Sequence, residues 1–492
     1  MRRTLLLVTL SALLLAVPTS GAGASPFEPP RSQWYANNDT SHFQNTTRVR
    51  IDESCLALPA EEQVACSLAA FKAKPFTVIA FVDSGINPYH QDFRAPEFVH
   101  HPSNFIEGYP AAAPAAQLSL DVADQSGYAA ARAADDSKTL SKLARNKLYW
   151  FPGTRIIGGY STTSGGVTGS FPERNIIDEN GHGTGVSSVA AGEFYGSNPN
   201  ALIVMVEGLG DASLSWASSQ PWIDIVSNSW GNIGNVPLGD TAATKAAVNR
   251  GQTVAFAGGN GATNTNSYTV FDPLPVDDPC RCKTPDSNPT FTSPYGGPSW
   301  VLTVGAVSPI NGQAHWWHSV PVDVSSFGSK WRAAAVYGVT RQENRDFGGT
   351  SCATPVTAGV LSTLIERARI EFGDTVAGQR PNQAVAVATP GADYPSTGPL
   401  ADGVLTRSEA EAMVQKTAFP VPFDPEKGTW DYAIRPTTAT YYAYQGYGVV
   451  NRTSRDLAHQ VLMGEAALPQ RQEVDDFIAR ADILRNAVWG NP

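Results

Sequence analysis

A run of mostly apolar, β-branched residues from Phe76 to Val82 constrains the fold of this chain more than any other feature. A strand with one wet face would alternate apolar and polar residues, whereas this run suits burial on both faces. Such strands are typical of parallel sheets covered by helices on each side. Asp83 ends the run, where open α/β sheets place their ligands, although alone it is better explained as a turn aspartate before Ser84 and Gly85.

A histidine flanked by glycines follows in the motif Asp-Glu-Asn-Gly-His-Gly-Thr-Gly, residues 178–185. No neighbouring Cβ blocks the approach of another group to the imidazole of His182. The small residues after it suit a helix packed tightly in a core. A lone histidine is usually structural, but this combination rarely arises by accident.

Two further motifs place a polar side chain beside glycine and an apolar run. Thr253–Ala257 predicts a strand that leads to Gly258, Gly259 and Asn260, and Gly349-Thr350-Ser351 precedes a predicted buried helix from Val356 to Leu364. Taken alone, the first is an Asn-Gly turn and the second a helix cap. A serine at a helix start also has backbone N–H groups directed at whatever it attacks.

Together the four motifs supply a carboxylate, an imidazole, an amide donor and a hydroxyl, from Asp83, His182, Asn260 and Ser351. Nucleophilic acyl transfer needs these groups, because a weak hydroxyl requires a base, the base an orienting carboxylate and the oxyanion hydrogen-bond donors.

The order of these residues and their flanking glycines resembles the subtilisin-like serine proteases over roughly residues 74–455. The resemblance implies an α/β fold, with a three-layer α/β/α arrangement around a mostly parallel central sheet and large loop insertions. It implies Ser351 as the nucleophile, His182 as the general base and then acid, and Asp83 as the orienting carboxylate. Asn260, with the Ser351 N–H, would form the oxyanion hole. The implied substrate-binding residues are Ser229, Trp230, Gly231, Gly258 and Gly259.

The predicted organisation has four parts. Residues 1–24 are typical of a signal peptide, with Arg2 and Arg3, an apolar run and an Ala22-Gly23-Ala24 cleavage site. Residues 25–73 form an N-terminal arm, shorter than the family's usual prodomain. Residues 74–455 form the catalytic domain, with insertions at about 93–160 and 263–295, and 456–492 a C-terminal helical tail.

The first insertion is predicted to contain a helical stretch from about Asp121 to Lys147. It is interpreted as a surface elaboration, with a lid over the substrate cleft as the alternative, since long loops in compact domains are often functional.

The five cysteines suit an exported protein that uses disulfides in part. Cys55 and Cys66 lie close together in the sequence and are the favoured pair. Cys280 and Cys282 are too close for an ordinary relaxed disulfide, so a strained ring, pairing elsewhere and a metal half-site stay open. Cys352 is then a free thiol, interpreted as a small buried apolar side chain.

Composition restricts the partners. The formal charge of −10 argues against nucleic-acid binding. Past the signal peptide, no stretch approaches the roughly eighteen apolar residues of a membrane span, so we expect a secreted protein without a stable membrane anchor. We also expect a monomer acting on polypeptides. The chemistry requires no cofactor and no metal ligands are identified, although the resemblance leaves a structural Ca²⁺ ion open.

These observations predict a secreted serine endopeptidase that works through an acyl-enzyme intermediate. A dedicated peptide-processing maturase or ligase would use the same site and is the first alternative. The second is an inactive binding protein that retains the fold, against which the intact set of four residues argues.

Overall fold

The computed structural model describes most of the predicted catalytic domain and the C-terminal region. The described residues are 58–59, 62, 66, 76–162, 176–231, 241–260, 295–307, 322–329, 331–335, 344–371, 385–386, 404–420 and 445–490.

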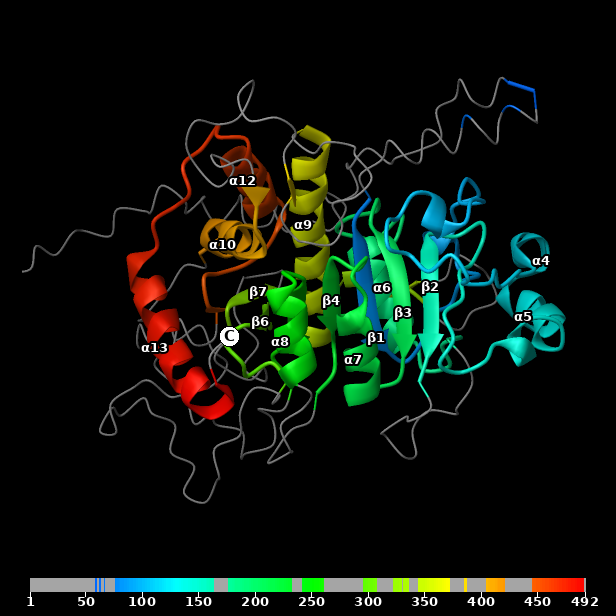
Figure 1. Ribbon diagram of the computed structural model, residues 1–492, viewed down its shortest axis with the longest axis horizontal. Helices are drawn as coiled ribbons and strands as arrows, with labels where there is room; N and C mark the ends of the chain where they lie inside the picture. The colour runs from blue at the N-terminus through cyan, green and yellow to red at the C-terminus, as the bar shows by residue number, and fades with distance from the viewer. Residues whose placement is uncertain are drawn as a thin grey trace, which may run out of the picture.

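A seven-stranded sheet forms the centre of the molecule, in the order β2-β3-β1-β4-β5-β6-β7 (Figure 1). All of its pairings are parallel, so the strands end at a common edge. The strands are β1 (Val78–Asp83), β2 (Ile156–Ser161), β3 (Leu202–Glu207), β4 (Ile225–Asn228), β5 (Thr253–Ala257), β6 (Leu302–Val307) and β7 (Val324–Phe327).

The side chains of β1 alternate between two hydrophobic cores, one on each face of the sheet. Ile79 and Phe81 belong to the core that contains α6 and α9, whereas Val78, Ala80 and Val82 belong to the core that contains α7 and α8. The expected three-layer α/β/α fold is therefore confirmed. The covering helices are α6 (His182–Ala191), α7 (Asp211–Ser219), α8 (Thr241–Asn249) and α9 (Thr350–Glu371).

The other elements lie outside this framework. The helices are α4 (Leu120–Ser126), α5 (Tyr128–Asp136), α10 (Arg407–Thr417), α12 (Arg452–Leu462) and α13 (Gln472–Trp489), with short 3₁₀ turns at Gln91–Phe93, Pro102–Asn104 and Leu140–Lys142. Two antiparallel pairs join β8 (Trp331–Ala334) to β9 (Asn344–Phe347) and β10 (Val385–Ala386) to β11 (Val404–Leu405).

The helical stretch predicted for the first insertion is wrong in extent. Helices α4 and α5 end at Ser126 and Asp136 rather than running on to Lys147. Gly127 separates them with a φ of 87°, which helical residues do not adopt. Glycine has no side chain and can adopt this conformation, so the helix is interrupted at Gly127. The helix-favouring residues around it led to the prediction of one longer helical stretch.

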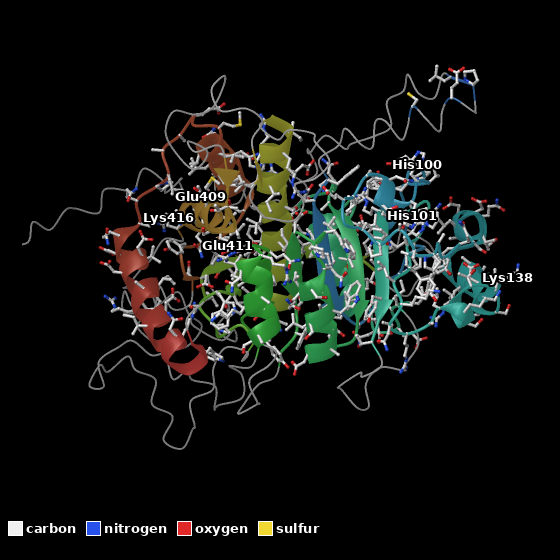
Figure 2. The ribbon with its side chains drawn as sticks, in the orientation of Figure 1. His100, His101, Lys138, Glu409, Glu411 and Lys416 are labelled. Carbon is white, nitrogen blue, oxygen red and sulfur yellow. The ribbon has the colours of Figure 1, made fainter. Side chains whose placement is uncertain are left out.

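Helix α10 is anchored to the central sheet by a buried carboxylate (Figure 2). Thr253 Oγ1, at the start of β5, donates to Glu411 Oε1 at 2.8 Å. Arg407, one turn earlier on α10, forms an ion pair with the same side chain. Burial raises the pKa of Glu411, and the charge of Arg407 opposes that shift.

Helix α13 is bound to the sheet through a buried arginine. The guanidinium of Arg485 is 1% exposed and donates to Asp323 Oδ1 at 2.9 Å and Asp482 Oδ1 at 3.2 Å. The other oxygen of Asp323 accepts from the N–H of Thr303 in β6, at 2.7 Å. Val474 and Phe477 add apolar contacts with the core. The predicted C-terminal helix thus belongs to the folded domain.

Several predictions concern residues outside the described ranges. They are the signal peptide, almost all of the N-terminal arm, Cys55 of the expected Cys55–Cys66 pair, and Cys280 and Cys282 with nearly all of the second insertion. Where the structure is described, none of the helices combines the length and apolar character needed to span a bilayer.

Replacing Arg485 with alanine should destabilise the fold by about 3–5 kcal/mol, because it leaves the Asp323 carboxylate buried without its cation. Chemical denaturation measures the change. Arg480→Ala, which removes an exposed arginine from the same helix, is the control. Equal denaturation midpoints for the two variants would contradict the structural role of Arg485.

Candidate active site

Asp83 occupies the carboxyl end of β1, the middle of the sheet edge predicted to hold the site. Its side chain is 2% exposed. The N–H of Ser84 donates to Asp83 Oδ1 at 2.7 Å and holds the carboxylate beside the turn that follows the strand. The charge is therefore buried but hydrogen bonded, as a buried carboxylate requires.

His182 is the first residue of α6, and glycines allow that helix to begin against β1. Gly181 has a φ of 94°, a conformation that side chains disfavour. A Cβ on Gly183 would lie 2.1 Å from the carbonyl oxygen of Gly85, so only glycine permits this approach. The flanking glycines thus have the close-packing role that the sequence indicated.

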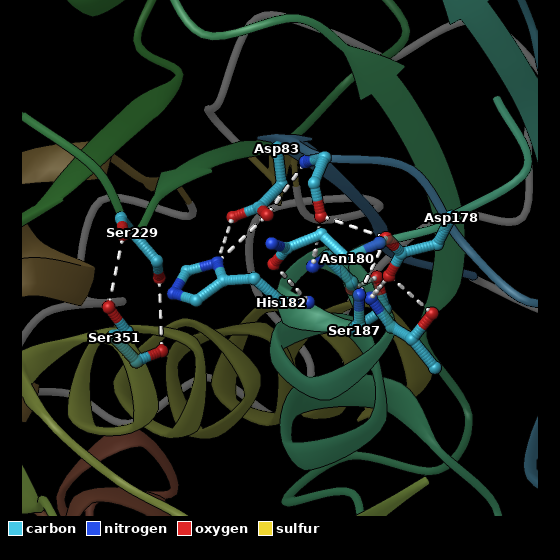
Figure 3. Close-up of polar contacts among 11 residues, drawn as sticks. Asp83, Asp178, Asn180, His182, Ser187, Ser229 and Ser351 are labelled. Carbon is cyan, nitrogen blue, oxygen red and sulfur yellow. Dashed lines mark hydrogen bonds and ion pairs between the residues drawn. The ribbon is translucent and has the colours of Figure 1, made fainter. Parts of the chain in front are cut away.

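The imidazole of His182 is hydrogen bonded to the carboxylate of Asp83. His182 Nδ1 lies 2.9 Å from Asp83 Oδ1 and 3.0 Å from Oδ2. Since the carboxylate accepts, Nδ1 carries the proton and Nε2 is left as the basic nitrogen. Figure 3 shows the ring between Asp83 and the pair Ser229 and Ser351, directed toward that pair.

Opposing effects set the basicity of His182. Burial lowers its pKa, but the charge and hydrogen bond of Asp83, with a contribution from the charge of Asp178, raise the pKa above 6.5. The charge of Arg345 acts in the opposite direction.

Asp178 stabilises the turn that leads to His182, a role that was not predicted from the sequence. Its Oδ1 accepts from Ser84 Oγ at 3.0 Å and from the N–H groups of Asn180 and Gly181 at 2.9 and 2.8 Å. Its Oδ2 accepts from Thr184 N and Oγ1 at 2.9 and 2.7 Å. The position of Asp178 four residues before His182 is visible in the sequence, but its complete burial and its hydrogen bonds are not.

Ser351 is the second residue of α9, where its N–H has no acceptor within the helix. Its Oγ donates to the carbonyl of Ser229 at 3.1 Å, and Ser229 Oγ donates to the carbonyl of Ser351 at 3.1 Å. Among the described residues no hydrogen bond joins Ser351 Oγ to His182. A hydroxyl can rotate, and such contacts often tighten only when substrate binds.

Asn260 follows β5 and is fixed by Thr350, the residue before Ser351. Thr350 donates to Asn260 Oδ1 from its N–H at 3.0 Å and from Oγ1 at 2.8 Å. Because an N–H can only donate, these bonds identify Oδ1 as the acceptor. A Cβ on Gly349 would lie 2.9 Å from Asn260 Nδ2, so the amide group lies beside the start of α9.

The predicted substrate-binding residues lie at the ends of β4 and β5. Ser229 contacts Ser351, and the N–H of Gly259 donates to Thr350 Oγ1 at 3.2 Å. The N–H of Gly258 is used within the sheet, bonded to Val304 at 2.9 Å. Gly231, after Trp230, is exposed.

The indole of Trp230 packs against two aromatic rings that were not predicted from the sequence to lie near the site. Its ring centroid lies 4.8 Å from that of Tyr295 and 5.5 Å from that of Phe256. Tyr295 OH donates to Asp211 Oδ1 at 2.9 Å, which ties this aromatic group to the start of α7.

The first insertion contacts the turn before His182. Arg132 of α5 forms an ion pair with Glu179. Asp135 of the same helix accepts from Tyr89 OH at 2.9 Å and from Ser119 N at 2.7 Å. These contacts attach α5 to the segment that follows β1, through Tyr89, and to the turn before His182, through Glu179.

Cys352, beside Ser351, is completely buried and is a free thiol. Burial raises the pKa of its thiol. It therefore packs as a small apolar side chain, as expected. The described residues contain no group of three or more His, Cys, Asp or Glu arranged to hold a metal ion.

Comparison with known proteins adds a family relationship. The model of the subtilase family matches residues 76–378. Among solved structures, the chain is similar to the epidermin leader peptide processing serine protease of Staphylococcus aureus, with 14% identity, a TM-score of 0.42, and coverage of 80% of this chain and 79% of that one. None of the curated proteins matches in sequence.

Replacing Asp83 with asparagine should lower the pKa of His182, because it removes the charge that raises it while burial still acts to lower it. NMR titration of protein labelled at histidine measures the change, with His182→Gln to assign the resonance. Asp124→Asn, in the exposed part of α4, should leave that pKa unchanged.

Replacing Arg132 with alanine should loosen the turn before His182. Both partners of the Arg132–Glu179 pair are about one-quarter exposed, so we expect a loss of about 1 kcal/mol or less and an increase of up to about fivefold in amide exchange at residues 179–182. Hydrogen exchange with mass spectrometry measures it. Lys138→Ala removes an exposed cation near the same helix and should have no effect there.

Proposed function

Since the chain belongs to the subtilase family of serine peptidases, we propose that it is an endopeptidase that uses Asp83, His182 and Ser351 as its catalytic triad. The observation that carries the assignment is the bond from His182 Nδ1 to both oxygens of Asp83, with the ring directed at Ser351 (Figure 3). That bond sets the tautomer in which Nε2 accepts a proton.

In the proposed reaction, Nε2 of His182 removes the hydroxyl proton of Ser351 as Oγ attacks the carbonyl carbon of the substrate. Asp83 stabilises the imidazolium that forms. The tetrahedral intermediate collapses when His182 donates the proton to the leaving amine, and the acyl group stays on Ser351. Water, deprotonated by His182, then releases the acid.

The oxyanion is stabilised by donors that are already oriented. Thr350 holds Asn260 Oδ1, so Nδ2 is available to the oxyanion, and the N–H of Ser351 adds a second donor at the start of α9. The acyl half of the substrate would lie along Ser229–Gly231 as an added strand.

The raised pKa of His182 determines the pH dependence. Below its pKa the imidazole is charged and cannot act as a base, so activity should rise with pH through a value above 6.5.

The setting of the reaction is also a proposal. The N-terminal sequence supports secretion. That the protein is a monomer, acts on polypeptides and holds a structural Ca²⁺ ion are further proposals. A dedicated processing enzyme is the second candidate, favoured by the contact of the insertion with the turn before His182. Cleavage of a peptide library separates broad from narrow specificity.

A fluorophosphonate probe should label the wild-type protein, and Ser351→Ala should abolish labelling because the probe reacts with an activated serine. Ser137→Ala, which changes an exposed serine, should label normally. Labelling of Ser351→Ala at the wild-type level would refute the assignment of the nucleophile.

Asn260→Ala should lower kcat by about 10²–10³ with little change in KM.

A further inference from the structure

The β8–β9 hairpin places a second group of side chains beside His182. The N–H of Ala334 in β8 donates to Ser188 Oγ of α6 at 2.8 Å, which fixes the hairpin to the helix that carries the histidine. The ring of Phe347, at the end of β9, meets the imidazole edge to face, with centroids 5.5 Å apart.

The alternation of a strand places Arg345 on the same face as Phe347 and turns Asp346 to the other face. The contacts agree, since the guanidinium carbon of Arg345 lies 5.2 Å from the centroid of the Phe347 ring. Asp346 is exposed and pairs in register with the exposed Arg332 of β8. The nearest carboxylate in the sequence therefore does not face Arg345.

Arg345 is partly buried without an anionic partner. Its Nε has no access to solvent and no hydrogen-bond partner, and within the described part of the chain its side chain forms no ion pair. A partly desolvated cation is unfavourable unless an anion binds it. Two other partly or fully buried arginines, Arg485 and Arg369, are instead paired with aspartates.

The position of Arg345 also works against the proposed chemistry unless an anion binds there. Burial lowers the pKa of His182, Asp83 and Asp178 raise it, and Arg345 opposes these carboxylates. The imidazolium that forms during catalysis is therefore repelled by Arg345. A substrate carboxylate bound to the guanidinium would offset this repulsion when the proton is on His182.

We propose that Arg345 is a specificity-determining residue that binds an aspartate or glutamate side chain of the substrate, one or two residues after the bond to be cleaved. This inference rests on the proposed peptidase function. The leaving side is assigned because His182 delivers its proton to the leaving amine, whereas the acyl side follows Ser229–Gly231. Arginine suits the task, since its guanidinium can bind a carboxylate through two parallel hydrogen bonds.

The test uses internally quenched peptides with amidated C-termini that differ only at the first two leaving-side positions. We expect kcat/KM to be higher by about tenfold or more for aspartate or glutamate than for asparagine or glutamine, and lowest for lysine. Arg345→Gln should remove the preference, Arg345→Lys should retain part of it, and Arg345→Glu should reverse it in favour of lysine. Arg332→Gln, on the opposite face of the same hairpin, is the matched control.

Two outcomes would overturn the inference: a wild-type protein that does not prefer acidic leaving-side residues, or an Arg345→Gln variant that keeps the preference. Fluorophosphonate labelling separates this failure from failure of the proposed function, because the probe has no leaving peptide. Wild-type protein that does not label counts against the peptidase assignment. Protein that labels but shows no acidic preference counts against the role of Arg345 alone. Labelling of each variant also verifies that it is folded.

Discussion

The site depends on the close approach of two backbone segments, the turn after β1 and the start of α6. A side chain on Gly183 would overlap the carbonyl of Gly85, so the helix can begin beside the turn after the strand only because residue 183 is glycine. Asp178 then holds the two segments together, accepting from Ser84 on one side and from Gly181 and Thr184 on the other. The bond between Asp83 and His182 follows from this arrangement.

Ser351, the proposed nucleophile, is positioned by a second group of contacts. Helix α9 lies in the core on one face of the sheet and begins at the edge where β4 and β5 end. Its first residue, Thr350, binds Asn260, and its second, Ser351, exchanges hydrogen bonds with Ser229. Residues from the ends of β1, β4 and β5 and from the starts of α6 and α9 therefore meet at one edge of the sheet. They can meet there because parallel strands all end at the same edge.

The charged side chains around His182 have opposing effects on its pKa. Asp83 and Asp178 are buried and fully hydrogen bonded, so their stabilisation of the imidazolium is built into the fold. Arg345 opposes them from the β8–β9 hairpin, and its side chain has no protein anion in the described part of the chain. The carboxylates of Asp83 and Asp178 thus raise the pKa of His182, and the charge of Arg345 lowers it.

The α/β class and the strand ends that hold Asp83 and Asn260 could be predicted from the sequence, because buried parallel strands and glycine-rich turns leave strong local patterns. The sequence also predicted that Ser351 begins a helix. The role of Asp178, the ion pair of Arg132 with Glu179 and the contact of the β8–β9 hairpin with His182 could be found only from the folded structure. These depend on side chains from distant segments meeting in space, and a contact of that kind leaves no periodicity or spacing in the chain.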